Sequence, residues 1–262
     1  IDMDENKEYV ILGKGVGFGK KVSQRFDKPE GCTTYRLEQE TERGSAKELV
    51  KGIEPEYLEI ADAILTESQK VFGDSIDRGI LFPLADHISF AVARIRRNEQ
   101  ISNPLTEDIK VLFYSEFKVA ETLKTILRER LQIEIDDHEV GYVALHIHSA
   151  IGDEKVSVAM QTARAVRECI DMIEKATGKP IDVLSLSYNR LMNHMKYMVA
   201  RASTGEKLNL DMNEYMLDQY PQAYKVATDI CKNLEGCIGH KLDETETGYL
   251  AMHIQRVYKD AV

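Results

Sequence analysis

The sequence predicts a mainly α-helical protein, in which a small N-terminal β domain precedes two homologous helical-bundle domains. Three observations predict this fold class: a repeat with one constant offset, apolar residues at helical spacing throughout the repeat, and strand-like runs confined to the first 48 residues. A chain of 262 residues suits two or three domains.

The repeat has an offset of 107 residues in three separated blocks. The matching blocks are His87–Arg94 with His194–Arg201, Phe117–Ala120 with Tyr224–Ala227, and Gly141–Ile147 with Gly248–Ile254. Glu139 and Glu246 match at the same offset. A constant offset indicates a duplicated domain without net insertion. We therefore expect an N-terminal domain at residues 1–48 and two copies of a second domain at residues 49–158 and 159–262.

Helical periodicity runs through both copies. From Pro55 to Phe72, apolar residues recur on one face and acidic residues lie in the first turn. The same pattern predicts helices at Ala85–Arg97, Tyr114–Leu131, Val156–Ala176, Tyr188–Ala202 and Tyr224–Leu234. Gly, Pro and Asn occupy the gaps, so each copy should form a bundle of about five helices.

The N-terminal segment has a different pattern. Tyr9–Leu12 and Thr33–Leu37 are short runs of strand type, and glycine alternates with other residues between Gly13 and Gly19. As a strand, this stretch would place Lys14, Val16, Phe18 and Lys20 on one face. A composition shift near Glu42, Arg43, Gly44 and Ser45 indicates a hinge to the first helical domain.

The glycine stretch leaves two interpretations open. It lacks the spacing of a phosphate-binding loop and the third glycine of a dinucleotide-binding loop. It could be a tight hairpin or bulge without a ligand. It could also contact nucleic acid, because Val10–Phe26 contains four basic residues and no acidic one, although the whole chain has a net charge of −10.

Four of the seven histidines recur at the repeat offset, as two pairs: His87 with His194, and His146 with His253. They could be buried helix-packing residues, since histidine is intermediate in burial. The spacing of histidines and cysteines does not suit a zinc site, and no nucleophile elbow is present. A histidine that accepts a phosphoryl group fits better, because imidazole is nucleophilic near neutral pH.

Arginines lie on the same helical face as two of these histidines. Arg94 is seven residues after His87, and Arg201 is seven residues after His194. The second copy adds Arg190 four residues before His194, where the first copy has Pro83. These arginines could be solvated side chains, or they could support a phosphate group, with the second copy holding it more tightly. We expect phosphorylation of His194 to tighten a dimer of the second copy through Arg190 and Arg201.

These motifs together resemble one family over essentially the whole chain. Leu12–Lys21 is similar to the end of an RNA-binding coantiterminator domain, and Asp86–Phe90 and Ala144–His148 are similar to the two histidine motifs of a phosphotransferase regulation domain. His194 and His253 fall at the matching motifs of a second such domain. The sequence therefore resembles the BglG/SacY family of bacterial transcription antiterminators.

The resemblance implies a function and a set of site residues. The N-terminal domain would dimerise and bind a hairpin in nascent messenger RNA, so that transcription of sugar-utilisation genes continues past a terminator. The implied phosphoacceptors are His87, His146, His194 and His253, with Asp86, Arg94, Arg190 and Arg201 as phosphate-site support. Gly13, Lys14, Phe18 and Lys20 are the expected RNA-binding residues. Compared with the family, the coantiterminator domain should lack its first strand.

The expected partners are HPr, a sugar-specific enzyme II of the phosphotransferase system, the RNA hairpin and a second copy of the chain. Two other functions remain open: a histidine phosphocarrier that relays the phosphoryl group, and a DNA-binding activator with the same regulation domains. We expect no enzymatic activity, metal or cofactor. The absence of a long apolar run, of a signal segment and of a cysteine framework predicts a cytoplasmic protein without membrane insertion.

Overall fold

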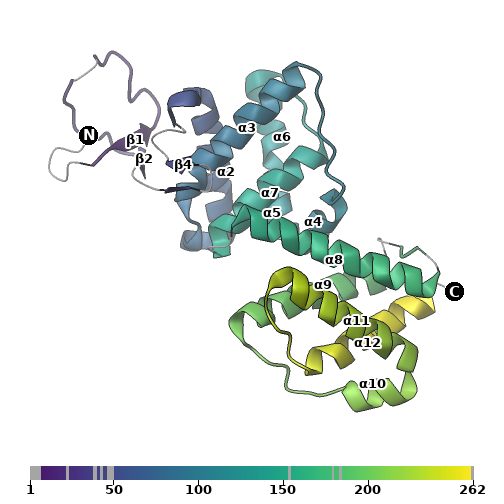
Figure 1. Ribbon diagram of the computed structural model, residues 1–262. Coiled ribbons are helices and arrows are strands. Elements are labelled where there is room, and N and C mark those ends of the chain that lie inside the picture. Colours follow the sequence, from purple (N-terminus) through teal and green to yellow (C-terminus); the bar gives the residue numbers. More distant parts are fainter. Residues whose placement is uncertain are drawn as a thin grey trace. The chain divides into compact units, whose positions relative to one another are not determined.

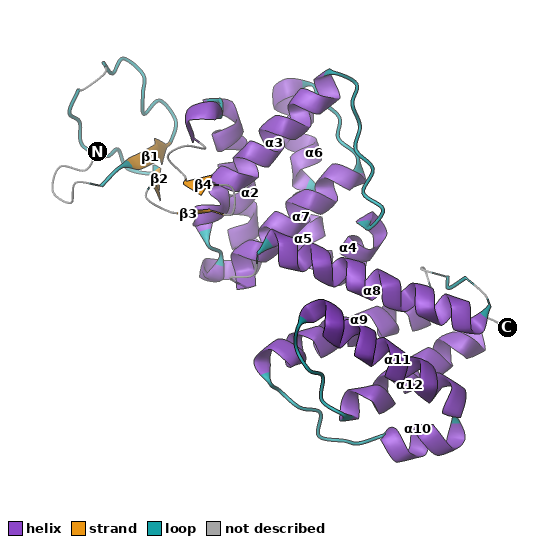
Figure 2. Ribbon diagram, viewed as in Figure 1, coloured by secondary structure: helices purple, strands orange, loops and turns teal. Residues whose placement is uncertain are grey.

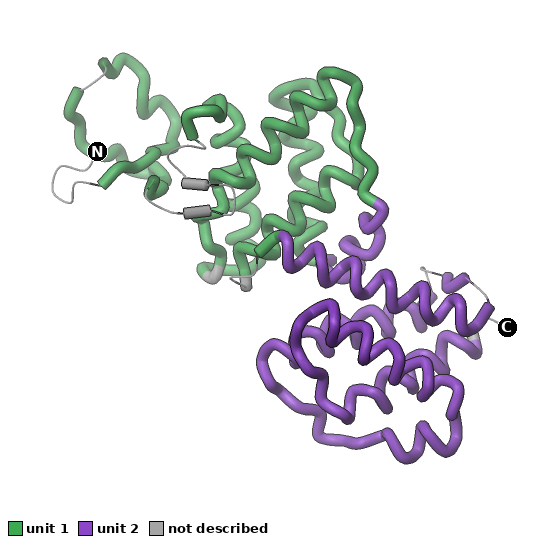
Figure 3. The backbone as a smooth tube through the Cα atoms, viewed as in Figure 1, with its two compact units in different colours: residues 1–103, 115–156 green, residues 104–114, 157–262 purple. Residues whose placement is uncertain are grey.

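A computed structural model describes residues 7–21, 24–37, 40–41, 44–45, 50–152, 155–178, 180–182 and 185–260. The chain divides into two compact units, one of residues 1–103 with 115–156 and the other of residues 104–114 with 157–262 (Figure 3). Among the described residues, the strands all lie in the N-terminal segment and the rest is helical (Figure 2). The predicted fold class, mainly α with a small N-terminal β part, is confirmed.

The N-terminal strands form two short antiparallel pairs (Figure 1). Strand β1 (Tyr9–Leu12) pairs with β2 (Thr33–Arg36), and Tyr9 lies opposite Arg36. Strand β3 (Glu40–Thr41) pairs with β4 (Gly44–Ser45). Both expected strands are present, the second ending one residue early. Of the expected hinge, Glu42 and Arg43 lie outside the described residues.

The glycine stretch between β1 and β2 is a series of turns and not the strand that would have placed Lys14, Val16, Phe18 and Lys20 on one face. The backbone N–H groups of Val16, Phe18 and Lys20 each donate to the carbonyl oxygen three residues before, at 3.1–3.3 Å. Gly15 and Gly19 have φ values of 75° and 71°, in the left-handed region that glycine enters without steric cost. The alternating glycines therefore serve repeated tight turns.

The first copy begins with helix α2 (Pro55–Phe72), at the predicted bounds. Two short 3-10 helices, η1 (Gly73–Ser75) and η2 (Arg78–Ile80), lead to α3 (Leu81–Arg96). The remaining helices are α4 (Thr106–Leu112), α5 (Tyr114–Ala120), α6 (Thr122–Leu131) and α7 (Asp137–Gly152). The core between α2 and α3 consists of fully buried aliphatic and aromatic side chains, including Ile60, Ile64, Leu84 and Ile88.

The single helix predicted at Tyr114–Leu131 is wrong, because it is divided into α5 and α6. The hydroxyl of Thr122 donates to the carbonyl oxygen of Val119 at 2.7 Å. Next to the break, the Lys124 N–H donates to the carbonyl oxygen of Glu121, three residues before, at 3.0 Å, which is the bond of a tighter 3-10 turn. The second copy has Asp229 at the position matching Thr122, and its helix there is continuous.

The second copy consists of α8 (Val156–Thr177), α9 (Leu186–Thr204), α10 (Asn213–Gln219), α11 (Pro221–Ile238) and α12 (Thr245–Asp260). The repeat offset of 107 residues carries over to helix bounds, since α10 matches α4 and α11 matches α5 and α6 together. Ser185 caps α9 by accepting a hydrogen bond from the Tyr188 N–H at 3.1 Å. Gly205 ends the helix in the left-handed conformation that favours glycine.

Within the first unit, strand β2 is anchored to the first helical copy by Tyr35. The side chain is buried and its ring packs edge-on against Phe82, with the centroids 6.2 Å apart. Its hydroxyl donates to Asp62 and accepts from Arg78 at 2.7 Å, and Arg78 also binds Asp62 at 2.7 Å. Burial and the neighbouring Asp62 raise the pKa of the Tyr35 hydroxyl. The N-terminal sheet thus contacts the start of α3, the helix that carries His87.

Candidate functional site

In the first copy, the predicted histidines come together between α3 and α7. His87 on α3 and His146 on α7 are both buried, with ring centroids 5.4 Å apart. Nε2 of His87 lies 3.4 Å from a carboxylate oxygen of Glu139, and Arg94 donates to the other oxygen at 2.8 Å. One buried carboxylate therefore holds both the histidine and the arginine that the sequence placed on one face of α3.

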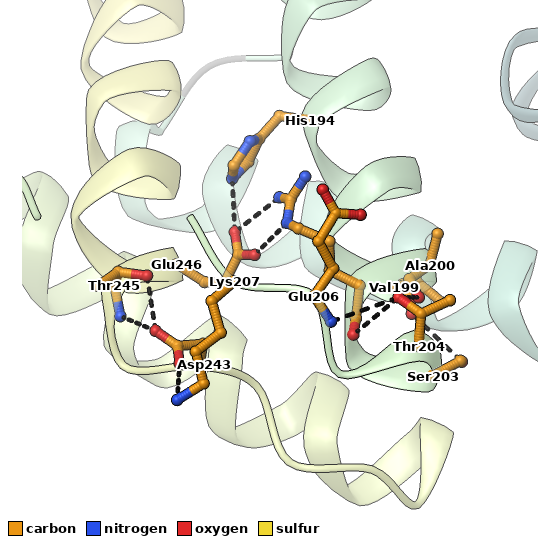
Figure 4. A network of polar contacts seen from close by, with 11 residues as sticks. His194, Val199, Ala200, Ser203, Thr204, Glu206, Lys207, Asp243, Thr245 and Glu246 are labelled. Atoms are coloured by element: carbon orange, nitrogen blue, oxygen red, sulfur yellow. Dashed lines mark hydrogen bonds and ion pairs between the residues drawn. The ribbon is translucent and has the colours of Figure 1, made fainter. Parts of the chain in front are cut away.

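The second copy repeats this arrangement between α9 and α12. His194 stacks on His253, with ring centroids 4.8 Å apart, and its Nε2 lies 3.6 Å from Glu246. Arg201 donates to both oxygens of Glu246, at 2.6 and 2.9 Å. Figure 4 shows the ring of His194 directed at the Glu246 carboxylate. The same constellation in two copies, at the repeat offset, identifies it as the candidate site.

Burial lowers the pKa values of the two histidines in the second copy. Loss of solvent lowers the pKa of His194 to about 3, and nearby His253 and Arg201 add to the effect. Burial also lowers the pKa of His253 to about 4, with smaller contributions from Arg256 and Arg190. Both rings are therefore neutral at pH 7, and a neutral ring nitrogen has the lone pair that a nucleophile needs.

The glutamate of the first copy is ionised despite its burial. Burial alone would raise the pKa of Glu139, but its contacts with His87 and Arg94 outweigh that effect and lower the pKa. In the second copy, hydrogen bonding to Glu246 raises the pKa of Arg201. Each copy therefore contains a contact between a buried glutamate and a partly buried arginine beside a histidine pair.

The four residues predicted to support a phosphate group lie in different surroundings. Arg94 and Arg201 are held by glutamates, while Arg190 is exposed and acts on His253 rather than on its helix neighbour His194. Asp86 lies on α3, partly exposed, directly before His87.

Sequence reasoning missed the roles of four residues in these sites: Glu139 and Glu246, which hold the arginines, and Tyr142 and Tyr249, whose rings lie 5.7 and 6.1 Å from those of His87 and His194. The signal was present in the sequence. Glu, Tyr and His recur at positions i, i+3 and i+7 of α7 and again of α12, and this spacing places all three on one helical face.

The three histidines without a counterpart at the repeat offset lie apart from these constellations. Nδ1 of His138 lies 3.3 Å from the backbone nitrogen of Asn103, and Nδ1 of His148 lies 2.9 Å from Glu116. His240 is exposed at the end of α11. The described residues contain no group of three or more side chains arranged to hold a metal ion.

The expected RNA-binding residues all lie in the turns that follow β1. Gly13, Lys14 and Lys20 are exposed, and Phe18 is 91 % exposed. The ammonium group of Lys20 lies 5.1 Å from the ring centroid of Phe26. A Cβ at Gly13 would lie 2.5 Å from Sγ of Cys32, so a larger residue there would displace that side chain. The segment presents backbone, an aromatic ring and positive charge to solvent, which suits a single-stranded or looped nucleic acid.

Comparison with known proteins gives matches along nearly the whole chain. Residues 62–150 and 167–257 match the PRD domain family, and residues 1–44 match the CAT RNA-binding domain family. The chain is 29 % identical over 259 residues to the glcA/glcB genes antiterminator of Staphylococcus carnosus, covering 97 % of this chain and 89 % of that protein. It is 26 % identical over 262 residues to the transcription antiterminator LicT of Bacillus subtilis, covering 98 % and 94 %.

A solved structure also matches in part. The crystal structure of GlcT CAT-PRDI aligns with a TM-score of 0.48 and 26 % identity, covering 56 % of this chain and 87 % of that one. Among the described residues, no helix has the length and apolar character needed to cross a membrane.

Proposed function

The chain belongs to the BglG family of RNA-binding transcription antiterminators with PRD regulatory domains, and on that premise we propose that it controls a sugar-utilisation operon through phosphorylation of its duplicated histidines. The observation that carries the proposal is the repeated constellation of a histidine pair, an arginine and a buried glutamate that pairs with the arginine and lies beside one of the histidines. His87, His146, His194 and His253 are the proposed phosphoacceptors. Asp86, Arg94, Arg190 and Arg201 are the proposed phosphate-site support.

The shielding of the acceptor rings supports regulation rather than phosphate relay. The side chains of His87 and His194 are only 10 % and 8 % exposed. A carrier that passes phosphoryl groups onward needs an accessible ring, whereas a regulator gains from a ring whose modification disturbs packing. A phosphoryl group brings nearly two negative charges, and beside Glu139 or Glu246 it would repel a buried carboxylate. Phosphorylation would therefore reorganise the contacts between the two helices.

The N-terminal segment supports RNA as the ligand rather than DNA. The described part of residues 7–45 forms strands and turns instead of a helix-turn-helix. We propose that Gly13, Lys14, Phe18 and Lys20 contact a hairpin in messenger RNA. The proposed domains are residues 1–48 for RNA binding, with residues 49–158 and 159–262 for regulation.

The proposed partners follow from this function. HPr and a sugar-specific enzyme II of the phosphotransferase system would be the phosphoryl donors, and the RNA-binding form would be a homodimer. All of them meet in the cytoplasm, where we place the protein. As a regulator, the protein needs no cofactor of its own.

The experiment that tests the proposal is transcription through a terminator that overlaps the hairpin, with the chain unphosphorylated or phosphorylated by HPr or enzyme II. Read-through should change on phosphorylation, and His87→Ala and His194→Ala should weaken that response. His240→Ala is the matched control and should behave like the unaltered chain. If the level of read-through changes neither on phosphorylation nor with the two histidine substitutions, the proposal is contradicted.

A further inference from the structure

Two arginines in the second copy lie beyond the glutamate-held site, near His253. The helices α9 and α12 pack antiparallel, with Arg201 against Glu246 and His194 against His253. The next turn of the pair therefore brings Arg190, four residues before His194, towards the turn that carries Arg256, three residues after His253. Both guanidinium groups act electrostatically on the His253 ring.

Arg201 is paired with a carboxylate, whereas Arg190 and Arg256 are not paired with any described carboxylate. Arg201 donates from Nε and Nη2 to the two oxygens of Glu246, and its side chain is 14 % exposed. Arg190 and Arg256 are exposed, and neither is in an ion pair or hydrogen bond with another described part of the chain. Arg201 would have to leave a buried carboxylate to reach a new anion, whereas Arg190 and Arg256 would not.

The first copy lacks both arginines. At the repeat offset, Pro83 stands in place of Arg190 and Ser149 in place of Arg256. The hydroxyl of Ser149 donates to the backbone oxygen of His146 at 2.7 Å, so it is a local helix contact and not a source of positive charge. The two copies thus share the histidine pair and the glutamate–arginine pair but differ in the charge beside the second histidine.

We propose that His253 is the residue on which the second domain retains a phosphoryl group, with Arg190 and Arg256 as the cations that hold it. This inference rests on the proposed function, in which the duplicated histidines are phosphorylated, and it adds the two counter-charges that would hold phosphate on His253. Guanidinium groups bind phosphate oxygens with charge-assisted, often bidentate, hydrogen bonds. The first copy has Pro83 and Ser149 at the two matching positions, so we expect His146 to lose its phosphoryl group faster.

The transfer step is balanced with a phosphohistidine protein as donor. The lone pair of one nitrogen of the neutral His253 ring forms the new P–N bond, and the donor's P–N bond breaks with its electron pair returning to the donor ring. The proton released from the other nitrogen of His253 is matched by the proton that the donor ring takes up. Burial, with smaller contributions from Arg256 and Arg190, keeps the ring neutral before transfer, and the two guanidinium groups attract the phosphoryl oxygens afterwards.

The test uses the full chain charged by HPr that has been phosphorylated from phosphoenolpyruvate. Site-resolved mass spectrometry measures phosphate on each histidine, at saturation and during a chase after the donor is removed. The variants are Arg190→Gln, Arg256→Gln and the double variant. Arg164→Gln is the matched control, because Arg164 is an exposed arginine of α8 in the same unit.

We expect each substitution to shorten the lifetime of phosphate on His253 roughly threefold, and the pair about tenfold, as for partly solvated charge pairs. Arg164→Gln should leave it unchanged, and Ser149→Arg should lengthen the lifetime on His146. Two results would overturn this inference and leave the proposed function intact. One is phosphate on His194 but not on His253, and the other is a phosphate lifetime on His253 that is unchanged in both arginine variants. Absence of phosphate from all four duplicated histidines would overturn the proposed function itself.

Discussion

Replacing Glu246 by Gln should destabilise the second copy while leaving the first copy unchanged. The glutamate is 1 % exposed, and its two oxygens accept from Arg201 at 2.6 and 2.9 Å. The amide keeps the shape but removes the charge, so Arg201 is left with a partly buried positive charge that nothing balances. Breaking one side of a buried pair in this way costs about 3–5 kcal/mol.

The expected loss for Glu246→Gln is smaller than that range. The Arg201 side chain is 14 % exposed, and the amide oxygen still accepts one hydrogen bond, so we expect about 2 kcal/mol. Arg201→Met should cost about 3 kcal/mol, because it leaves the less exposed Glu246 charge alone. The double variant removes both charges together, and its loss should fall well short of the sum, giving a coupling free energy of about 2 kcal/mol.

Hydrogen exchange of the α9 and α12 amides measures these free energies locally, which suits a chain that contains no tryptophan to report unfolding. The matched control is Glu139→Gln in the first copy, which should change exchange in α3 and α7 only. Its loss should be smaller, because Arg94 is 25 % exposed and donates a single hydrogen bond to Glu139. If the stability losses of Glu246→Gln and Arg201→Met add up to the loss of the double variant within about 0.5 kcal/mol, the two side chains are not coupled and the reasoning is refuted.

Three further predictions concern pH, RNA and packing. The pKa values of His194 and His253 lie near 3 and 4 instead of near 6.5, so the unfolded second copy binds more protons between about pH 6.5 and pH 4. Its stability, measured by hydrogen exchange of α9 and α12, should therefore decrease as the pH is lowered through that window, by up to roughly 1.4 kcal/mol per pH unit for each histidine. His253→Gln should make the dependence of stability on pH less steep. Phe18→Ala should weaken binding of the hairpin RNA by about 1–3 kcal/mol in a titration without changing the melting temperature, whereas Tyr215→Ala, also exposed, should change neither. Gly248→Ala should cost about 1–3 kcal/mol by calorimetry, because its Cβ would lie 2.7 Å from the backbone of Asn213, while Gly236→Ala, with open space around it, should be neutral or stabilising.

The sequence predicted the fold well where one rule dominates. Apolar periodicity placed α2 at its observed bounds, Pro55–Phe72, and the constant offset revealed the duplication before any geometry was known. It was wrong at Tyr114–Leu131, where the helix is interrupted at Glu121, and it left open the conformation of Gly13–Gly19, which forms turns. Such outcomes depend on single local hydrogen bonds, which periodicity does not detect.

The candidate site was predicted in part. The offset selected four histidines by matching the two copies, and the structure brings together the two within each copy, His87 with His146 and His194 with His253. The roles of Arg94 and Arg201 could not be read from α3 and α9 alone, because their partners Glu139 and Glu246 lie 45 residues further along the chain on other helices. Arg190 and Arg256 acquire their relation to His253 only when α9 and α12 are paired in space.

We expect the phosphotransferase system to act on this chain at the duplicated histidines, which lie beside Glu139 and Glu246. A site-resolved map of acid-labile phosphate, made after incubation with phosphorylated HPr or enzyme II, tests it most directly. Phosphate should appear among His87, His146, His194 and His253 and be absent from His138, His148 and His240. Phosphate confined to those last three histidines, or found on no histidine, would contradict the claim.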